Sequence, residues 1–483
     1  MGLRCDLIVR NATVFDGTGA ERFRADVGVT GDRISAVGDL GGASADREIV
    51  ADGLAVAPGF IDAHTHDDRA VLCGPGCMRC KTSQGVTTVV VGNCGVSLSP
   101  VAMTQRPPPP LDLLGDESWW RFGSFGDYAD ALALTPPPVN VVALIGHMSL
   151  RLEAMGGDTQ RPATDAEAAR MQARLAEALD EGAAGFSTGL WYPPSMMAPT
   201  DEVIAVAEAL RNRHALYVTH MRDEAAGVLT SIDETVRIGD AVDVPVVISH
   251  HKCAMPENFG RSRETLPHID AAAARRRIDF DVYPYHAGST VLMPERVRPD
   301  VPVRVSWSKA HPERAGQMLA DIAAEWGCDL REAATRLLPA GGIYFQMDED
   351  DVRRILAHPR SMIGSDGLPH DDFPHPRLWG TFPRVLGHYA RDLGLFSLET
   401  AVHKMTGRPA DVFGLRDRGV VRAGAFADLV LFDPATVIDS ATFDTPTVPA
   451  RGIVETLVNG TVAYRAASPS PDTGSGRLLK RAA

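Results

Sequence analysis

The alternation of hydrophobic and polar positions changes character twice along this 483-residue chain. Residues 1–57 hold short alternating runs, including 26–29 and 33–37 on either side of a Gly31-Asp32 turn, which predict an antiparallel β module. Similar runs return near the C-terminus, where Asn459-Gly460 predicts a hairpin turn. Because the first stretch is too short to bury its own core, we expect residues 1–57 and 419–465 to form one β-sandwich domain, followed by a polar tail.

Between these stretches, over residues 58–418, apolar runs of strand length alternate with segments of helical periodicity. Helical spacing is clear in the segment 166–179, where Met171, Leu175 and Leu179 share one face. We find eight candidate strands, at residues 60–64, 87–92, 139–146, 185–188, 215–220, 244–250, 278–283 and 361–366. Eight β–α alternations place the chain in the α/β class and predict a (β/α)8 barrel of the TIM type.

Two stretches interrupt this alternation. Residues 102–138 are rich in proline and contain two consecutive tryptophans. Residues 284–345 form an insertion between the seventh and eighth strands that is far longer than a usual barrel connection. Because loops that follow barrel strands surround the active site, we expect this insertion to act as a lid.

Composition and charge exclude several classes of function. With 45% hydrophobic and 23% charged residues, the chain has the composition of a folded globular protein. A formal net charge of −14 argues against a nucleic-acid partner and against a polybasic membrane surface, but allows a local cationic pocket. No apolar run of about eighteen residues predicts a transmembrane helix, and no signal-peptide core is found near the N-terminus. We therefore expect a cytoplasmic protein whose seven cysteines are reduced thiols.

Candidate metal ligands lie at the ends of the expected strands, where barrel enzymes place their chemistry. His64 and His66 end the first strand, and because strand side chains alternate between faces, both imidazoles point the same way. Further candidates follow the second, fifth, sixth and eighth strands: Cys94, His220, His250 and Asp366. Imidazole, thiolate and carboxylate all bind zinc, and a thiolate favours zinc over magnesium or manganese. These six residues predict a catalytic zinc site.

The same motifs resemble the amidohydrolase superfamily and, more narrowly, the N-acyl-D-amino-acid deacylase (D-aminoacylase) family. The resemblance spans essentially the whole chain and rests on Ala57-Pro58-Gly59-Phe60-Ile61-Asp62-Ala63-His64-Thr65-His66, Gly92-Asn93-Cys94-Gly95, Thr219-His220-Met221-Arg222-Asp223-Glu224, Ser249-His250-His251-Lys252, Ile363-Gly364-Ser365-Asp366-Gly367 and Ala427-Asp428-Leu429-Val430. The Asn-Cys-Gly motif is the narrower signal, because many relatives bridge their metals with a carboxylated lysine. The family implies a tightly bound zinc at Cys94, His220 and His250. It implies a second, weaker site near His64, His66 and Asp366.

The resemblance implies hydrolysis of the amide bond of a small N-acyl-D-amino acid, which gives a carboxylate and a free D-amino acid. Zinc lowers the pKa of bound water towards about 7, so hydroxide is available near neutral pH. Besides binding metal, Asp366 is expected to accept the proton of the attacking water and pass it to the leaving nitrogen.

The resemblance also implies a set of substrate contacts. A carboxylate suits the planar fork of an arginine, and the residues expected around the substrate α-carboxylate are Arg377, Tyr283 and Ser289, with Tyr192 and Lys252 beside them. Arg296 lies in the insertion and is placed to meet an acidic side chain, although a solvated lid residue is an equally open interpretation. We expect selectivity for D substrates, while an acidic and an apolar side-chain preference both stay open.

Two alternatives compete with this interpretation. A ring-opening amidohydrolase, similar to dihydroorotase or hydantoinase, would share the barrel and the His-X-His pair, but Cys94 and the open carboxylate-binding set weigh against it. A non-catalytic metal-binding protein on the same barrel is the second alternative, and the complete ligand set weighs against that. The sequence carries no feature that sets the oligomeric state or the occupancy of the second metal site.

Overall fold

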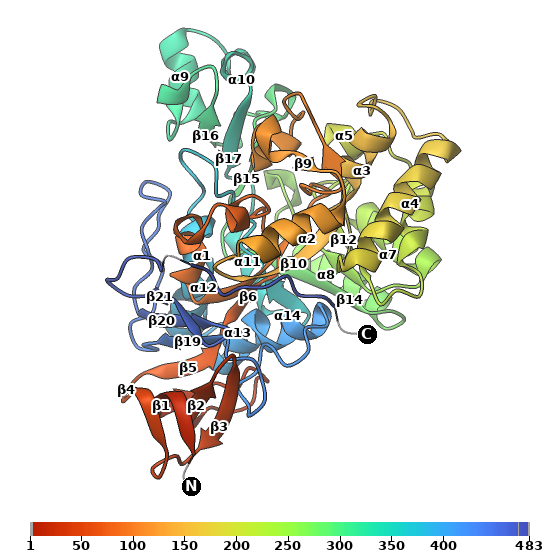
Figure 1. Ribbon diagram of the computed structural model, residues 1–483. Coiled ribbons are helices and arrows are strands. Elements are labelled where there is room, and N and C mark those ends of the chain that lie inside the picture. Colours follow the sequence, from red (N-terminus) through yellow and green to blue (C-terminus); the bar gives the residue numbers. More distant parts are fainter. Residues whose placement is uncertain (1–2, 472, 482–483) are drawn as a thin grey trace.

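The centre of the molecule is a closed barrel of eight parallel strands (Figure 1), seen in a computed structural model that describes residues 3–471 and 473–481. The strands follow one another around the barrel in chain order: β6 (Phe60–Asp62), β7 (Val86–Val91), β10 (Asn140–Gly146), β11 (Gly185–Gly189), β12 (Leu216–His220), β13 (Val246–Ile248), β14 (Ile278–Val282) and β18 (Ser361–Ile363). The amide of Ala63 donates to the carbonyl of Ile363, which closes the barrel between β6 and β18. The barrel expected from the sequence is confirmed.

Helices cover the outside of the barrel. They are α1 (Arg79–Thr82), α3 (His147–Ala154), α4 (Asp165–Glu181), α5 (Pro193–Met196), α6 (Thr200–Ala207), α7 (Val228–Val242), α8 (Ser262–Ala273), α11 (Glu349–Ala357), α12 (Arg377–Arg384), α13 (Leu398–Met405) and α14 (Gly407–Val412). The longest, α4, begins with a capping box in which Thr164 and Glu167 satisfy each other's backbone amides. Among the described residues, no helix combines the length and the apolar character needed to cross a membrane.

The interior of the barrel is filled by apolar side chains, and residues near the C-terminus pack against this interior core. Residues such as Ile61, Val90 and Leu144 form this core, and Leu479 packs against it. The backbone of Leu479 donates to Val141, whose amide in turn donates to Arg477. The expectation of a polar tail is therefore wrong for this part, because two leucines near the C-terminus supply apolar surface that the barrel buries.

The insertion between β14 and β18 folds as a small unit of its own. It contains a three-stranded antiparallel sheet and two helices: β15 (Gly288–Val291), β16 (Val303–Ser308), β17 (Ala340–Tyr344), α9 (Leu319–Trp326) and α10 (Leu330–Leu337). A separate cluster of buried residues, including Leu319, Ile322 and Leu337, holds this unit together. The proline-rich stretch lies before it in the chain and forms β8 (Val101–Ala102), β9 (Arg121–Phe122) and α2 (Phe125–Leu134).

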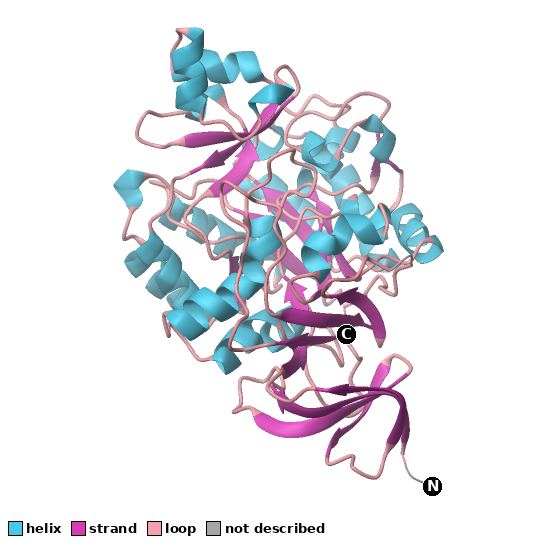
Figure 2. Ribbon diagram, turned by 90° about the vertical axis from the view of Figure 1, so that its left-hand side faces the viewer, coloured by secondary structure: helices cyan, strands magenta, loops and turns pink. Residues whose placement is uncertain are grey.

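Both ends of the chain build one β domain, as expected, which lies at the opposite end of the molecule from the insertion (Figures 1 and 2). Its eight strands form a single sheet: β1 (Arg4–Val14), β2 (Phe23–Thr30), β3 (Arg33–Gly38), β4 (Ser44–Val50), β5 (Ala55–Pro58), β19 (Leu429–Phe432), β20 (Ile453–Val458) and β21 (Thr461–Arg465). The expectation of a purely antiparallel N-terminal module is wrong, since β4 and β5 both run parallel to β1. Antiparallel pairing of β5 with β19 joins the two ends of the chain.

Candidate metal centre and adjoining cavity

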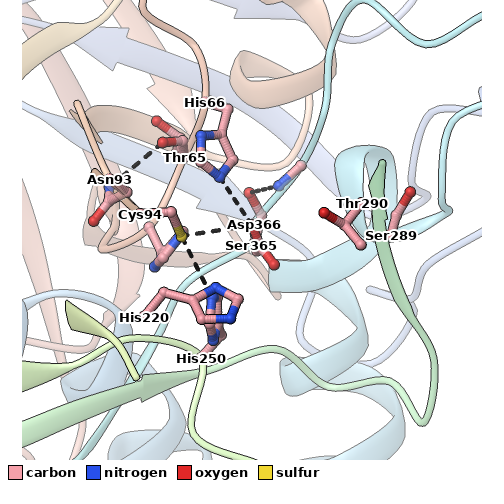
Figure 3. A network of polar contacts seen from close by, with 12 residues as sticks. Thr65, His66, Asn93, Cys94, His220, His250, Ser289, Thr290, Ser365 and Asp366 are labelled. Carbon is pink, nitrogen blue, oxygen red and sulfur yellow. Dashed lines mark hydrogen bonds and ion pairs between the residues drawn. The ribbon is translucent and has the colours of Figure 1, made fainter. Parts of the chain in front are cut away.

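The six expected ligands converge at the carboxyl ends of the barrel strands. Figure 3 shows His66, Cys94, His220, His250 and Asp366 pointing toward one another. Their possible donor atoms form three overlapping groups, each with all atoms within 4.8 Å of one another: His64 with His66 and Cys94, Cys94 with His220 and His250, and His64 with His250 and Asp366. The Cys94 Sγ atom lies 3.3 Å from His64 Nε2 and 3.4 Å from His250 Nε2. All six side chains are buried. Such spacing suits one or two metal ions that share neighbouring ligands.

The backbone is turned sharply at three of these residues. Cys94, His250 and Asp366 adopt φ angles of 53°, 35° and 50°, a region that non-glycine residues seldom occupy. Each follows the end of a strand, so the left-handed turn swings its side chain from the strand direction into the centre. The amide of Asp366 donates to the carbonyl of His64 over 2.8 Å, and the amide of His250 donates to Asp281 Oδ1 over 2.8 Å. These bonds hold the turned conformations in place.

The electrostatic surroundings favour a thiolate at Cys94. Burial would raise the pKa of this thiol, but the neighbouring His64 and His250 rings hold it well below its usual range. His220 adds an imidazole whose two ring nitrogens are buried and have no hydrogen-bond partner among the described residues. A buried thiolate beside unpartnered imidazole nitrogens is the donor set that zinc prefers, so the residues fit this metal.

Two carboxylates that sequence reasoning missed orient the histidines from behind. Glu224 Oε1 lies 3.0 Å from His250 Nδ1 and accepts a 2.7 Å hydrogen bond from Lys252 Nζ, which itself lies 2.8 Å from the same ring nitrogen. Asp281 lies 3.3 Å from His64 Nδ1. A carboxylate on the far ring nitrogen fixes the tautomer and the direction of a metal-binding histidine. Signals for both were present, because Glu224 ends the Thr219-to-Glu224 motif and Asp281 is an acidic residue in the otherwise apolar end of β14.

Asp366 is held between the histidines and an arginine. Its Oδ1 atom lies 3.3 Å from His66 Nε2, and its Oδ2 atom lies 2.9 Å from the guanidinium of Arg377. Burial would raise the pKa of Asp366, but the Arg377 guanidinium keeps it well below the usual range of a carboxyl group. Asp366 is therefore ionised at neutral pH.

A cavity opens beside this centre. Its lining combines metal-centre residues with side chains of the insertion, and includes Tyr192, Glu224, Lys252, Tyr283, Ser289, Thr290, Arg296 and Asp366. Five of the six residues expected to contact substrate thus line this one cavity. Part of the lining belongs to the candidate metal centre and part to the insertion, so a small molecule in this cavity would contact both.

Arg377 is the expected substrate residue that does not line this cavity. Its side chain is fully buried, donates to the carbonyl of Ser289 over 3.0 Å and stacks 4.6 Å from the ring of Tyr283. Since one guanidinium nitrogen also pairs with Asp366, Arg377 supports three residues of the site from behind. Lys252 is likewise engaged, because its ammonium group pairs with Glu224.

Tyr192, Ser289 and Arg296 present groups to the cavity itself. The Tyr192 hydroxyl bonds Thr290 Oγ1 over 2.9 Å, whereas Ser289 Oγ has no partner within the described ranges. The guanidinium of Arg296 stacks 4.6 Å from the ring of Trp191 and forms no ion pair with any described carboxylate. The cavity therefore offers a free hydroxyl and a free cation at the end formed by the insertion.

Comparison of this sequence with known proteins identifies its family. The sequence profile of the amidohydrolase family matches residues 47–279 and 262–464. This chain belongs to the amidohydrolase family. It is 54% identical over 480 residues to a D-aminoacylase of Alcaligenes xylosoxydans xylosoxydans, an alignment that covers 99% of this chain and 98% of that protein.

Solved structures of two amidohydrolases resemble the whole molecule. A D-aminoacylase superposes with a TM-score of 0.96 at 53% identity, over 99% of this chain and 100% of that one. That enzyme is described as having a binuclear metal centre with one-metal activation and second-metal attenuation. An N-acyl-D-glutamate deacylase from Bordetella bronchiseptica, complexed with zinc and a phosphonate mimic of the tetrahedral intermediate, superposes with a TM-score of 0.95 at 48% identity, over 99% and 100%. Because these relatives of similar identity are named for different substrates, overall likeness does not set the side-chain preference.

Proposed function

We propose that this amidohydrolase is a zinc-dependent N-acyl-D-amino-acid deacylase, which hydrolyses the amide bond to give a carboxylate and a free D-amino acid. The observation that carries the proposal is the convergence of Cys94, His220 and His250 beside an ionised Asp366, next to a cavity that His220, His250 and Asp366 help to line. Full-length relatives named for this activity support it. They also weigh against ring opening, and the complete ligand set weighs against a non-catalytic protein.

The metal is assigned to two unequal half-sites. Cys94, His220 and His250 would hold one zinc tightly, since a thiolate and two imidazoles are its preferred ligands. His64, His66 and Asp366 would hold a second ion more weakly, because that half has no thiolate of its own and its carboxylate is already paired with Arg377. When bound, zinc lowers the pKa of coordinated water towards about 7 and polarises an amide carbonyl.

The residues around the metal carry the proton and orient the substrate. Asp366 accepts the proton of the attacking water and delivers it to the nitrogen of the leaving amino acid. Arg377 keeps Asp366 ionised and fixed in position until that step. Glu224 and Asp281 keep the imidazoles directed at the centre, so that no reorganisation is needed during the reaction.

The cavity is assigned to the amino-acid part of the substrate. Ser289 and Tyr283 offer hydroxyl groups to the α-carboxylate, and the positive charges of Lys252 and Arg377 lie directly behind them. With the amide at the metal and the α-carboxylate held, the D configuration turns the side chain towards the insertion. There Arg296 is the unpaired cation, which favours an acidic side chain, while Met255 supplies apolar surface.

We propose a cytoplasmic location, and the state of the cysteine thiols supports it. All seven cysteines are free, and three of them, Cys73, Cys77 and Cys328, are exposed or half-buried, which suits the reducing cytoplasm.

Assays on pairs of enantiomers test the proposed function. N-acetyl-D- and N-acetyl-L-amino acids, dihydrouracil and hydantoin are each incubated with the zinc-loaded protein, and the release of free amino acid or ring opening is measured. We expect turnover of the D amides alone, abolished by a chelator and restored by zinc. Preference for the L enantiomers or for the cyclic amides would contradict the proposal, and absence of all turnover would favour the non-catalytic alternative.

A further inference from the structure

Lys81 is a fully buried lysine on α1 that lies directly behind the weaker half of the metal centre. Its ammonium group donates to Asp62 Oδ2 over 2.8 Å and to Ser365 Oγ over 2.6 Å, and lies 3.3 Å from Asp67 Oδ2. Each of its three partners is adjacent in sequence to a candidate ligand or within two residues of one. No step of the proposed reaction uses Lys81.

The partners of Lys81 join two loops that are far apart in sequence. Asp62 ends β6, and its Oδ1 atom accepts a 2.7 Å hydrogen bond from the amide of Ser365, beyond the end of β18. The hydroxyl of Ser365 in turn accepts from the amide of Gly367 over 3.2 Å, on the other side of Asp366. Lys81 therefore connects the loop that carries His64 and His66 to the loop that carries Asp366.

This connection lies at the closing seam of the barrel. Backbone hydrogen bonds across the seam are few: Ala63 donates to Ile363, and Asp366 donates to His64. By contrast, β12 and β13, which carry two ligands of the tight half, pair in a regular parallel register. A buried ammonium group with two carboxylates is strongly oriented, since each charge loses its compensation if a partner moves away. At the seam, the buried charges therefore add to the two backbone hydrogen bonds and to an isolated parallel bridge between Thr65 and Gly367.

We propose that Lys81 is a positioning residue that sets the geometry of the second metal half-site, His64, His66 and Asp366. The inference rests on the proposed function only in taking these residues as metal ligands. It predicts unequal effects on the two metal half-sites, which a general stabilising role would not. Loss of Lys81 must weaken the second metal while leaving the first, at Cys94, His220 and His250, nearly unchanged.

The test measures zinc binding to the metal-free protein by calorimetry, without substrate, so that its outcome does not depend on the enzymatic activity. Lys81→Met keeps the length of the side chain and removes its charge. Lys404→Met is the matched control, because Lys404 is also buried and bonded to β18, through Ser361 at the opposite end of the strand. We expect Lys81→Met to bind the first zinc within about threefold of the parent and the second at least about tenfold more weakly. The control should leave both affinities unchanged.

A second variant keeps the test decisive if Lys81→Met does not fold. Ser365→Ala removes one of the three contacts without leaving a buried charge unpaired, and is expected to weaken the second zinc selectively by a smaller factor. Inhibition of hydrolysis by excess zinc gives an independent measure of the second site. In the variants, the zinc concentration that inhibits should be higher than in the parent. Equal weakening of both sites, or an unchanged second site in either folded variant, would overturn the proposal.

Discussion

The two halves of the metal centre are built by different means. Cys94, His220 and His250 follow strands that belong to the regular part of the barrel, and a thiolate is among their donors. His64, His66 and Asp366 lie across the closing seam, where ion pairs made by Lys81 and Arg377 supplement the backbone pairing.

Under the proposed function, this difference would let one site separate zinc binding from proton transfer. The half with the strand ladder holds its ligands rigidly and favours a tightly bound ion. The seam half keeps a carboxylate ionised by an arginine, which suits proton acceptance but competes with tight metal binding. The comparison predicts that substitutions in the first half act on metal content and those in the second on turnover.

The largest effect is expected at Cys94. Removal of the thiolate in Cys94→Ala should lose most of the bound zinc and lower kcat/KM by at least about 10³, because the preferred soft ligand of the tight half is gone. Metal analysis of the purified variant, together with initial rates, checks this. His66→Ala is the control from the other half, and should keep one zinc per chain. Full zinc retention in Cys94→Ala would remove that residue from the site.

A smaller but still large effect is expected at Asp366. Asp366→Asn keeps the size of the side chain and removes its basicity, so kcat should fall by a factor of at least about 10² while KM changes little. Steady-state kinetics with the tightly bound zinc in place separate the two quantities. Near-normal turnover would assign the proton transfer to another group and would remove the proposed difference in role between the two halves.

These two residues also show what the sequence could predict. A barrel brings the carboxyl ends of all its strands to one edge, so each ligand could be placed from its position after an apolar run. The mixed parallel pairing of β4 and β5 could not be foreseen, because alternation specifies a strand but not the direction of its neighbour. Lys81 carried no signal, since its partner Ser365 meets it only through barrel closure.

An intermediate effect is expected behind the tight half, at Glu224. Glu224→Gln removes the charge that orients His250, and the affinity for the first zinc should fall by about 10- to 100-fold. Competition with a chelator of known affinity measures it. Glu202→Gln is the matched control, because Glu202 is a buried, ion-paired glutamate of α6 that pairs with Arg151 and contacts no candidate ligand. Equal losses in both variants would show a general cost of removing a buried charge.

The smallest effect concerns the insertion rather than the metal, and applies to some substrates alone. If Arg296 contacts an acidic side chain, Arg296→Met should cost about 2 kcal/mol in transition-state binding, or roughly 30-fold in kcat/KM, for N-acetyl-D-glutamate and N-acetyl-D-aspartate. The D-leucine and D-methionine derivatives should be spared. Equal losses on all four substrates would mean that Arg296 only orders the insertion.

Titration of the metal-free enzyme with zinc, followed by the initial rate of N-acetyl-D-amino-acid hydrolysis, tests the inequality of the two halves most directly. The solved D-aminoacylase with one-metal activation and second-metal attenuation gives the precedent. If Cys94, His220 and His250 hold the catalytic ion, the rate should rise to its maximum at one equivalent of zinc and decline as the second half fills. A rate that stays low at one equivalent and reaches its maximum only at two would contradict the account.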